Sequence, residues 1–186
     1  VSHFTEPTTH YWQQLLPPEA APREDAGPWQ YGYPARLPDG RILKLPIRPL
    51  ATEPRHAVAS LLVNHASMVV VRTLSRMLGE ALAPFGPDLV VGLPTLGLSL
   101  APGVAETLGH TRYVPLGYSR KFWYQEPLSA AVHSITSPTP GKRVYLDPHL
   151  LPLVELRGVG IGSASMARAF FRDIFLACSW RPKSAV

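Results

Sequence analysis

A strand, a tight turn and a helix are encoded in close succession between Asp88 and Gly109, and this stretch constrains the fold more than any other. Residues 89–91 form a short aliphatic run typical of a buried strand, and residues 98–108 carry apolar side chains at helical spacing. Gly109 stands where glycine commonly ends a helix. A strand that turns at once into a helix leaves the first N–H groups of that helix without backbone partners, so the turn is a candidate phosphate site.

The turn differs from the two best-known phosphate-binding loops. Gly92 and Gly97 enclose it, but no Lys-Ser/Thr pair follows as in a nucleoside-triphosphate P-loop, and the glycines do not have the spacing of a dinucleotide fingerprint. The sequence therefore predicts an anion site made by backbone amides. The alternative that the glycines serve only a tight turn stays open.

The surrounding elements predict an α/β fold with a parallel sheet and helices on both faces, because strand–helix–strand spacing requires right-handed crossovers. We expect one long helix over residues 57–83, strands over 111–116 and 142–146, a further strand within 150–160 and a helix over 166–177. The expected core face of the long helix consists of eight apolar residues: Val58, Leu61, Leu62, Met68, Val69, Leu74, Met77 and Leu78.

The N-terminal part of the chain has a different character. Many of the 21 prolines precede residue 55, which predicts loops and edge strands there. A β-hairpin pairing residues 31–37 with 41–47 is expected around the Pro38-Asp39-Gly40 turn signal. Residues 1–27 are interpreted as a loose arm, clamped onto the body or onto a second subunit by Tyr11, Trp12, Leu15 and Leu16. The predicted division is 1–50 for the arm and hairpin, and 51–186 for the core.

Residues 117–141 have neither helical nor strand periodicity, and a connection of that length is usually a functional lid or disordered. They contain a basic pair, Arg120 and Lys121, followed by three aromatic residues, Phe122, Trp123 and Tyr124. Asp147, which precedes a proline, is interpreted as a turn residue. A second glycine-containing turn, residues 160–165, also precedes a predicted helix. Two anion sites at one sheet edge suggest a ligand with two phosphate groups.

With this order of elements, residues 87–138 resemble the type I phosphoribosyltransferases, in particular those that act on adenine and other purines. The resemblance extends over roughly residues 57–177, and it implies a hood formed by the N-terminal hairpin. It implies that the first turn holds the pyrophosphate of phosphoribosyl diphosphate (PRPP) through the backbone of Pro94, Thr95, Leu96 and Gly97. It also implies that Mg²⁺ arrives bound to PRPP, and no protein-held metal site is predicted because the histidines lack ligand spacing.

The same resemblance implies roles for the lid and for the second turn. Arg120 and Lys121 are the candidate catalytic residues, which would neutralise the departing pyrophosphate when the lid closes. The lid aromatics are candidates for stacking on the base or for excluding water. The candidate 5′-phosphate loop is Gly162, Ser163, Ala164 and Ser165. Each assignment has a plainer alternative, because Lys121 suits a solvated surface, Trp123 and Tyr124 suit a core or an interface, and either serine suits a helix cap.

One family feature is missing from this sequence. Two adjacent acidic residues normally precede the 5′-phosphate loop and hold the ribose hydroxyls, but in the stretch from Val154 to Met166 Arg157 and Gly158 stand in their place in one register. In another register, several residues are absent before Gly162. A degenerate enzyme, a non-catalytic descendant and an incomplete sequence all explain this departure.

Composition and charge limit the remaining classes of function. The net charge of +5 suits an anionic small-molecule ligand, whereas the absence of a basic stripe or known motif disfavours a nucleic-acid partner. The single cysteine, Cys178, excludes an intrachain disulfide and suits a reducing compartment. We expect a cytoplasmic homodimer without a membrane segment. The leading hypothesis is transfer of phosphoribosyl from PRPP to a purine-like base, and the alternative is a non-catalytic regulatory protein that binds PRPP or a nucleotide.

Overall fold

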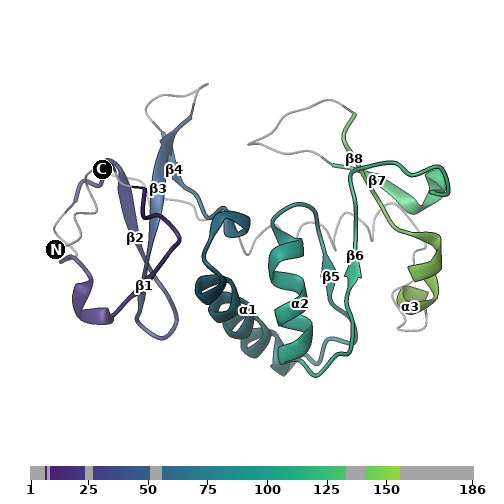
Figure 1. Cartoon of the computed structure of the whole chain (residues 1–186), viewed down its shortest axis with the longest axis horizontal. Coiled ribbons are helices and arrows are strands. Elements are labelled where there is room, and N and C mark those ends of the chain that lie inside the picture. Colours follow the sequence, from purple (N-terminus) through teal and green to yellow (C-terminus); the bar gives the residue numbers. More distant parts are fainter. Residues whose placement is uncertain (1–6, 8, 24–26, 51–55, 133–140, 156–186) are drawn as a thin grey trace. The chain divides into compact units, whose positions relative to one another are not determined.

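The structure, a computed structural model, describes residues 7, 9–23, 27–50, 56–132 and 141–155 of the 186-residue chain. The chain divides into two compact units (Figure 1). The first unit contains Val1–Pro87 and Thr95–Arg112, and the second contains Asp88–Pro94 and Tyr113–Val186.

The first unit contains an antiparallel sheet built around one long strand. Its members are β1 (Leu15–Leu16), β2 (Gly32–Arg36), β3 (Ile42–Pro49) and β4 (Ala57–Ala59), and β3 pairs with each of the other three. The β2–β3 pair confirms the predicted hairpin, with Ala35 opposite Leu43. At its turn, Gly40 has a φ of 87° and the Asp39 carboxylate accepts a hydrogen bond from the Arg41 N–H, at 3.1 Å.

The predicted loose arm is part of the core of this unit. Trp12 is buried with Leu43, Leu45 and Val70, and its Nε1 donates to the Ser60 carbonyl oxygen at 2.9 Å. β1 adds to the edge of β3, and a short 3₁₀ helix, η1 (Pro18–Ala20), follows. The described part of the arm therefore packs onto the body of the same chain through its aromatic and leucine side chains, which was one of the two predicted alternatives.

The long helix predicted over residues 57–83 is wrong for its first eleven residues, 57–67. The α-helix α1 spans Met68–Leu82, after β4 and the 3₁₀ helix η2 (Val63–His65). Ser67 caps its N-terminus by accepting a hydrogen bond from the Val70 N–H, at 3.3 Å. A 3₁₀ helix, η3 (Ala83–Phe85), ends it. Ala57 and its neighbours pair with β3 instead, because backbone pairing with a long strand outweighs weak helical periodicity.

The core face of α1 also differs from the prediction. Met68 and Val69 are 64% and 56% exposed, whereas Val70, Ser75 and Gly79 are buried. The prediction was wrong at Met68 and Val69, because it assigned the core face from apolar residues alone. Three other predicted members, Leu61, Leu62 and Leu74, do pack against the core. The helix packs closely against a second helix, and at such contacts small residues are buried.

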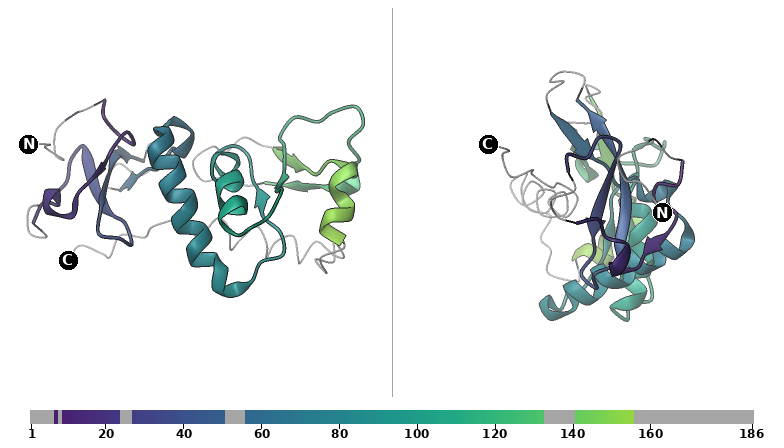
Figure 2. Two further views of the ribbon diagram at one scale, coloured as in Figure 1. Left: turned by 60° about the horizontal axis from the view of Figure 1, so that its bottom comes forward. Right: turned by 90° about the vertical axis from the view of Figure 1, so that its left-hand side faces the viewer.

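The second helix of this unit, α2 (Gly97–Thr107), lies beside α1 (Figure 1 and Figure 2). A Cβ atom on Gly79 would come within 2.6 Å of Thr107 Cβ, and one on Gly103 within 2.7 Å of Ser75 Cβ. The Ser75 hydroxyl donates to the Leu100 carbonyl oxygen at 3.2 Å. Small residues on both helices thus let the backbones approach closely. The predicted helix over residues 98–108 is confirmed to within one residue at either end, and Gly109 follows it with a φ of 78°.

The second unit is built from two small sheets. β5 (Val91–Gly92) and β6 (Val114–Pro115) are parallel, with Val91 opposite Val114. β7 (Ser129–Ala131) and β8 (Arg143–Tyr145) are antiparallel, followed by η5 (Pro148–Leu150) and α3 (Leu151–Glu155). The strand predicted over residues 142–146 is confirmed, but the described start of the stretch 150–160 is helical. Among the described residues, the predicted parallel core is represented by the β5–β6 pair.

None of the helices that the structure describes combines the length and the apolarity that crossing a membrane requires.

Candidate active site

The turn after β5 leads to a helix N-terminus that no side chain caps. Leu96, at the N-cap position of α2, already has helical backbone angles, and its side chain makes no cap hydrogen bond. The Ser99 N–H donates to the Leu96 carbonyl oxygen at 3.1 Å. Since the first N–H groups of an α-helix have no intrahelical acceptor, those of Gly97 and Leu98 are candidate donors to an anion, and the helix dipole favours one there.

The four residues predicted for pyrophosphate binding differ in what they can contribute. Thr95 is exposed, whereas Pro94, Leu96 and Gly97 are half-buried. Pro94 has no N–H group, so it shapes the turn without donating. The N–H groups of the other three remain as donors. Their binding of pyrophosphate stays a prediction.

β6 leaves its sheet at the same edge as β5. The N–H groups of Val114 and Leu116 donate to the carbonyl oxygens of Val90 and Gly92, both at 2.9 Å. Because the two strands are parallel, their carboxyl ends meet at one edge, which is where ligands bind in open α/β sheets. The segment predicted to be a lid begins here, at Gly117.

The predicted lid is more ordered than the sequence indicated. Residues 117–141 contain a 3₁₀ helix, η4 (Glu126–Leu128), and strand β7. Gly117 and Tyr145 exchange two backbone hydrogen bonds, at 3.1 and 2.8 Å. The Lys142 ammonium lies 4.0 Å from the centre of the Tyr118 ring. Over the described residues 117–132, the prediction of a connection without regular structure is therefore wrong, because pairing with β8 gives this part a partner that local periodicity cannot reveal.

The basic pair lies beside a small network of charges. The Glu126 carboxylate forms an ion pair with Arg143, with 3.1 Å between Oε1 and Nε. Nη2 of Arg120 lies 4.0 Å from the other oxygen of the same carboxylate. Arg143 also donates to the Ser129 hydroxyl at 2.8 Å. Lys121 is exposed and, among the described residues, has no ion pair. The two candidate catalytic cations thus differ, since Arg120 has a nearby carboxylate and Lys121 does not.

The three lid aromatics occupy different surroundings. Phe122 is 97% exposed and meets Trp123 edge to face, with ring centres 4.7 Å apart. Trp123 is 46% exposed, and its Nε1 donates to an oxygen of Asp147 at 3.1 Å. Tyr124 is half-buried and stacks on Tyr145, with ring centres 5.7 Å apart and planes 20° from parallel. Tyr124 is therefore part of the packing, and Phe122 is not.

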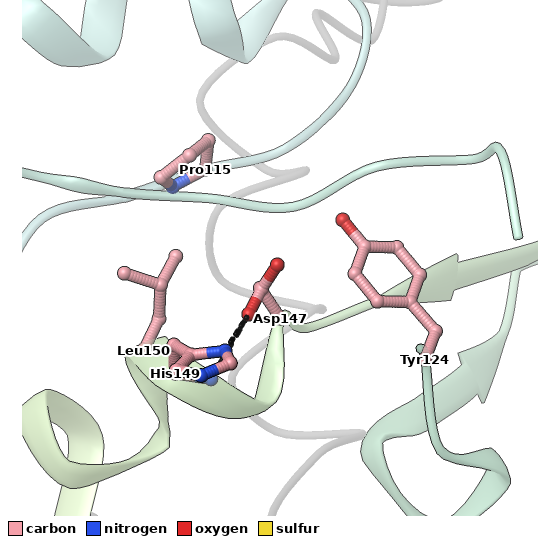
Figure 3. A pocket seen from close by; sticks show the side chains of 5 residues that line it. All are labelled: Pro115, Tyr124, Asp147, His149 and Leu150. Carbon is pink, nitrogen blue, oxygen red and sulfur yellow. Dashed lines mark hydrogen bonds and ion pairs between the residues drawn. The ribbon is translucent and has the colours of Figure 1, made fainter. Parts of the chain in front are cut away.

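A cavity of about 420 Å³ adjoins this aromatic segment (Figure 3). Figure 3 shows the Tyr124 hydroxyl and the Asp147 carboxylate pointing toward the strand that carries Pro115. The five lining residues are Pro115, Tyr124, Asp147, His149 and Leu150. The cavity thus combines apolar side chains with one carboxylate, one phenol and one imidazole.

The Asp147 carboxylate, which lines this cavity, accepts two hydrogen bonds. Its Oδ1 accepts a hydrogen bond from the His149 N–H at 2.9 Å, which caps η5, and its Oδ2 accepts the one from Trp123. These bonds, the one from the His149 backbone first, hold the pKa of the Asp147 carboxyl below its usual range. Asp147 is therefore ionised at neutral pH.

The second predicted anion loop lies outside the described residues, together with the preceding stretch that lacks an acidic pair. This applies to Gly162, Ser163, Ala164 and Ser165, and to the helix predicted after them. The part of the chain that the structure describes contains no group of three or more His, Cys, Asp or Glu side chains placed to hold a metal ion.

The geometry agrees with a comparison of the chain with known protein families. Residues 57–159, more than half of the 186 residues, match the family model described as phosphoribosyl transferase domain. The chain belongs to this family. A search of curated proteins found no match. The matched phosphoribosyl transferase domain begins at β4 and includes the β5–α2 turn, the basic pair and the lid aromatics, but it ends before the predicted 5′-phosphate loop.

Sequence reasoning missed the contacts of three residues around residues 117–126, the segment predicted to be a lid. Asp147 was interpreted as a turn residue, and its capping of η5 fits that interpretation, but its bond to Trp123 was not expected. The roles of Tyr145 and Glu126 were not predicted at all. Only the aspartate before a proline carried a signal, because contacts between residues 17 to 28 positions apart leave no periodic trace.

Proposed function

We propose that this phosphoribosyl transferase domain transfers the phosphoribosyl group of PRPP to a purine-like base and releases pyrophosphate. The observation that carries the proposal is the uncapped N-terminus of α2 directly after a parallel strand, within a chain of this family. Backbone amides in that position suit a diphosphate. The basic and aromatic segment after β6 supplies the other groups that such a reaction needs.

In the proposed reaction, a nitrogen of the base forms a bond to C1 of the ribose. The C1–O bond to the diphosphate breaks, its electron pair leaves with pyrophosphate, and the base nitrogen loses a proton. The N–H groups of Thr95, Leu96 and Gly97 stabilise the leaving pyrophosphate, and Lys121 adds a positive charge as bonding changes. Mg²⁺ carried by the diphosphate would supply further charge neutralisation.

A regulatory protein that binds PRPP without turnover is the second candidate. The observation that favours it is the sequence between Val154 and Met166, in which no two adjacent acidic residues occur. Without such a pair, the ribose hydroxyls lose the acceptors that orient C1. This candidate predicts binding of PRPP with Mg²⁺ and no release of pyrophosphate with any base.

Two measurements test these proposals. Calorimetry with PRPP and Mg²⁺ detects binding, and absence of heat at millimolar PRPP contradicts both candidates. Release of pyrophosphate with adenine, guanine, hypoxanthine and uracil then separates an enzyme from a regulatory protein. The Lys121→Ala variant is expected to lower kcat by about ten- to a hundredfold in an enzyme, the usual loss for one charge-assisted contact. It should leave PRPP affinity almost unchanged. The matched control is Arg76→Ala, an exposed cation of α1 outside the proposed site.

A further inference from the structure

Residues 117–126 contact strand β8 and Asp147 at four separate places. Gly117 pairs with Tyr145 through the backbone, and Tyr124 stacks on the same tyrosine. Glu126 bonds to Arg143, and Trp123 bonds to Asp147. The contacts of Gly117 and Glu126 lie at the ends of the segment. Between them, residues 121–124 are held by the Trp123–Asp147 hydrogen bond, by the stacking of Tyr124 and by the hydrogen bond from the Tyr124 N–H to the Lys121 carbonyl oxygen, at 3.0 Å.

These contacts leave two neighbouring side chains of the segment projecting into solvent. Phe122 is 97% exposed, and its ring contact is the edge-to-face one with Trp123. Lys121 is exposed beside it, without an ion pair among the described residues. An exposed phenylalanine whose neighbour is anchored by a charged hydrogen bond is held ready for contact at little further entropic cost, which is a form of preorganisation.

We propose that Asp147 is a positioning residue of the phosphoribosyl transferase domain, which acts through Trp123 to hold Phe122 and Lys121 in place for substrate. This inference rests on the proposed function and assigns a role in it to each of four side chains. Phe122 is the lid aromatic that meets the base, Lys121 is the cation that meets the diphosphate, and Trp123 and Tyr124 are their support.

The two carboxylate oxygens of Asp147 allow this role to be separated from helix capping. Oδ1 caps η5 through the His149 N–H, and Oδ2 accepts the Trp123 indole. Trp123→Phe removes the indole donor and keeps both the ring and the cap. Asp147→Ala removes the indole acceptor and the cap together. Asp147→Asn retains a single carbonyl oxygen, which serves either bond but not both.

The first test is NMR of the indole N–H groups of the full chain, which has four tryptophans. Trp123→Phe assigns the Trp123 signal. Asp147→Ala is expected to shift that signal and to speed its exchange with solvent, while the signal of buried Trp12 stays in place as an internal control for folding. An unchanged Trp123 signal in folded Asp147→Ala overturns the proposal.

The second test is a kinetic cycle on pyrophosphate release. Trp123→Phe and Asp147→Ala are each expected to lower kcat by about tenfold, with KM for PRPP changed by less than about threefold. The double variant should be no slower than the worse single variant, because both changes remove one interaction. Multiplicative effects, or an unchanged kcat, contradict the proposal.

A matched pair of exposed phenylalanines tests the role of Phe122. Phe122→Ala should raise KM for the base by about tenfold and Phe122→Tyr should restore it, whereas Phe85→Ala, at an 81% exposed position of η3, should change nothing. Equal behaviour of the two alanine variants overturns the proposal. If the wild-type chain neither binds PRPP nor releases pyrophosphate, the proposed function fails and this inference with it. Normal turnover in the variants removes this inference alone.

Discussion

The contacts within the first compact unit differ in kind from the contacts within the second. In the first unit, Trp12 is buried against β3, and glycines on α1 and α2 meet side chains of the opposite helix at close range. In the second unit, Val114 and Val144 are buried as well, but the strands are only two or three residues long and are joined by hydrogen bonds, ring stacking and ion pairs around residues 117–126.

This difference suggests that the first unit contributes more to the stability of the protein and that the second unit orients side chains toward a ligand. Apolar burial is nondirectional and contributes most of the free energy of folding, so the first unit is where we expect single changes to unfold the protein. Polar and aromatic contacts at a half-exposed surface contribute less to stability but hold side chains in definite orientations. The second unit is therefore suited to present groups to a ligand.

The largest expected effect comes from truncating Trp12. Trp12→Ala removes a buried ring and its hydrogen bond to Ser60, and it should lower the free energy of unfolding by about 3–5 kcal/mol. Urea denaturation followed by circular dichroism measures this change. Trp12→Phe keeps most of the buried area and should lose less. A small effect of Trp12→Ala would mean that the arm does not belong to the core.

A pair of glycine variants compares the two units directly. Gly103→Ala places a methyl group 2.7 Å from Ser75 Cβ and should cost about 1–3 kcal/mol, although alanine is the better helix former. Gly117→Ala, at an open position of the second unit, should change stability by less than about 0.5 kcal/mol. Thermal and urea unfolding measure both.

Replacing Ser75 by glycine in the Gly103→Ala background should recover much of the loss, because it removes the atoms that clash. If the double variant is no more stable than Gly103→Ala, the cost does not arise from helix contact.

Acid should loosen the lid before it unfolds the first unit. The pKa of Asp147 is lowered in the folded protein, so its bonds to His149 and Trp123 are fully present above the ordinary carboxyl pKa. They are lost as the pH falls through the lowered folded value, and the change begins below about pH 4. The Trp123 indole signal should move in that range while the Trp12 signal does not. Asp147→Asn should abolish the transition, and a simultaneous shift of both indoles would contradict it.

The smallest expected effect is at an exposed ion pair of α1. Arg76 and Glu80 lie 2.6 Å apart with both side chains more than half exposed. Arg76→Ala should lower the free energy of unfolding by less than about 0.5 kcal/mol, and high salt should reduce the difference further. A loss comparable with that of Gly103→Ala would show that surface charge stabilises the first unit as much as helix packing does.

The strand, turn and helix at the candidate pyrophosphate site were predictable because their signals are local. The turn after β5 was predicted from an aliphatic run, two glycines and helical spacing, which act within a few residues. The basic pair and the aromatics were found because they lie together in a segment without helical or strand periodicity, at the place where the family has its lid. Their contacts were not predictable, since the partners of Trp123 and Tyr124 lie more than 20 residues away along the chain. The second phosphate loop lies outside the described residues, so its prediction stays open.

The amino-acid sequence by itself determined the hairpin, the β5–α2 unit and the family, because turn chemistry, periodicity and motif order are properties of neighbouring residues. The tertiary structure decided which small residues of α1 are buried, that Trp12 belongs to the core, and that Trp123 donates a hydrogen bond to Asp147. Each of these features depends on contacts between residues that lie far apart in the sequence. They depend on which surfaces meet, and a one-dimensional pattern contains no distance between them.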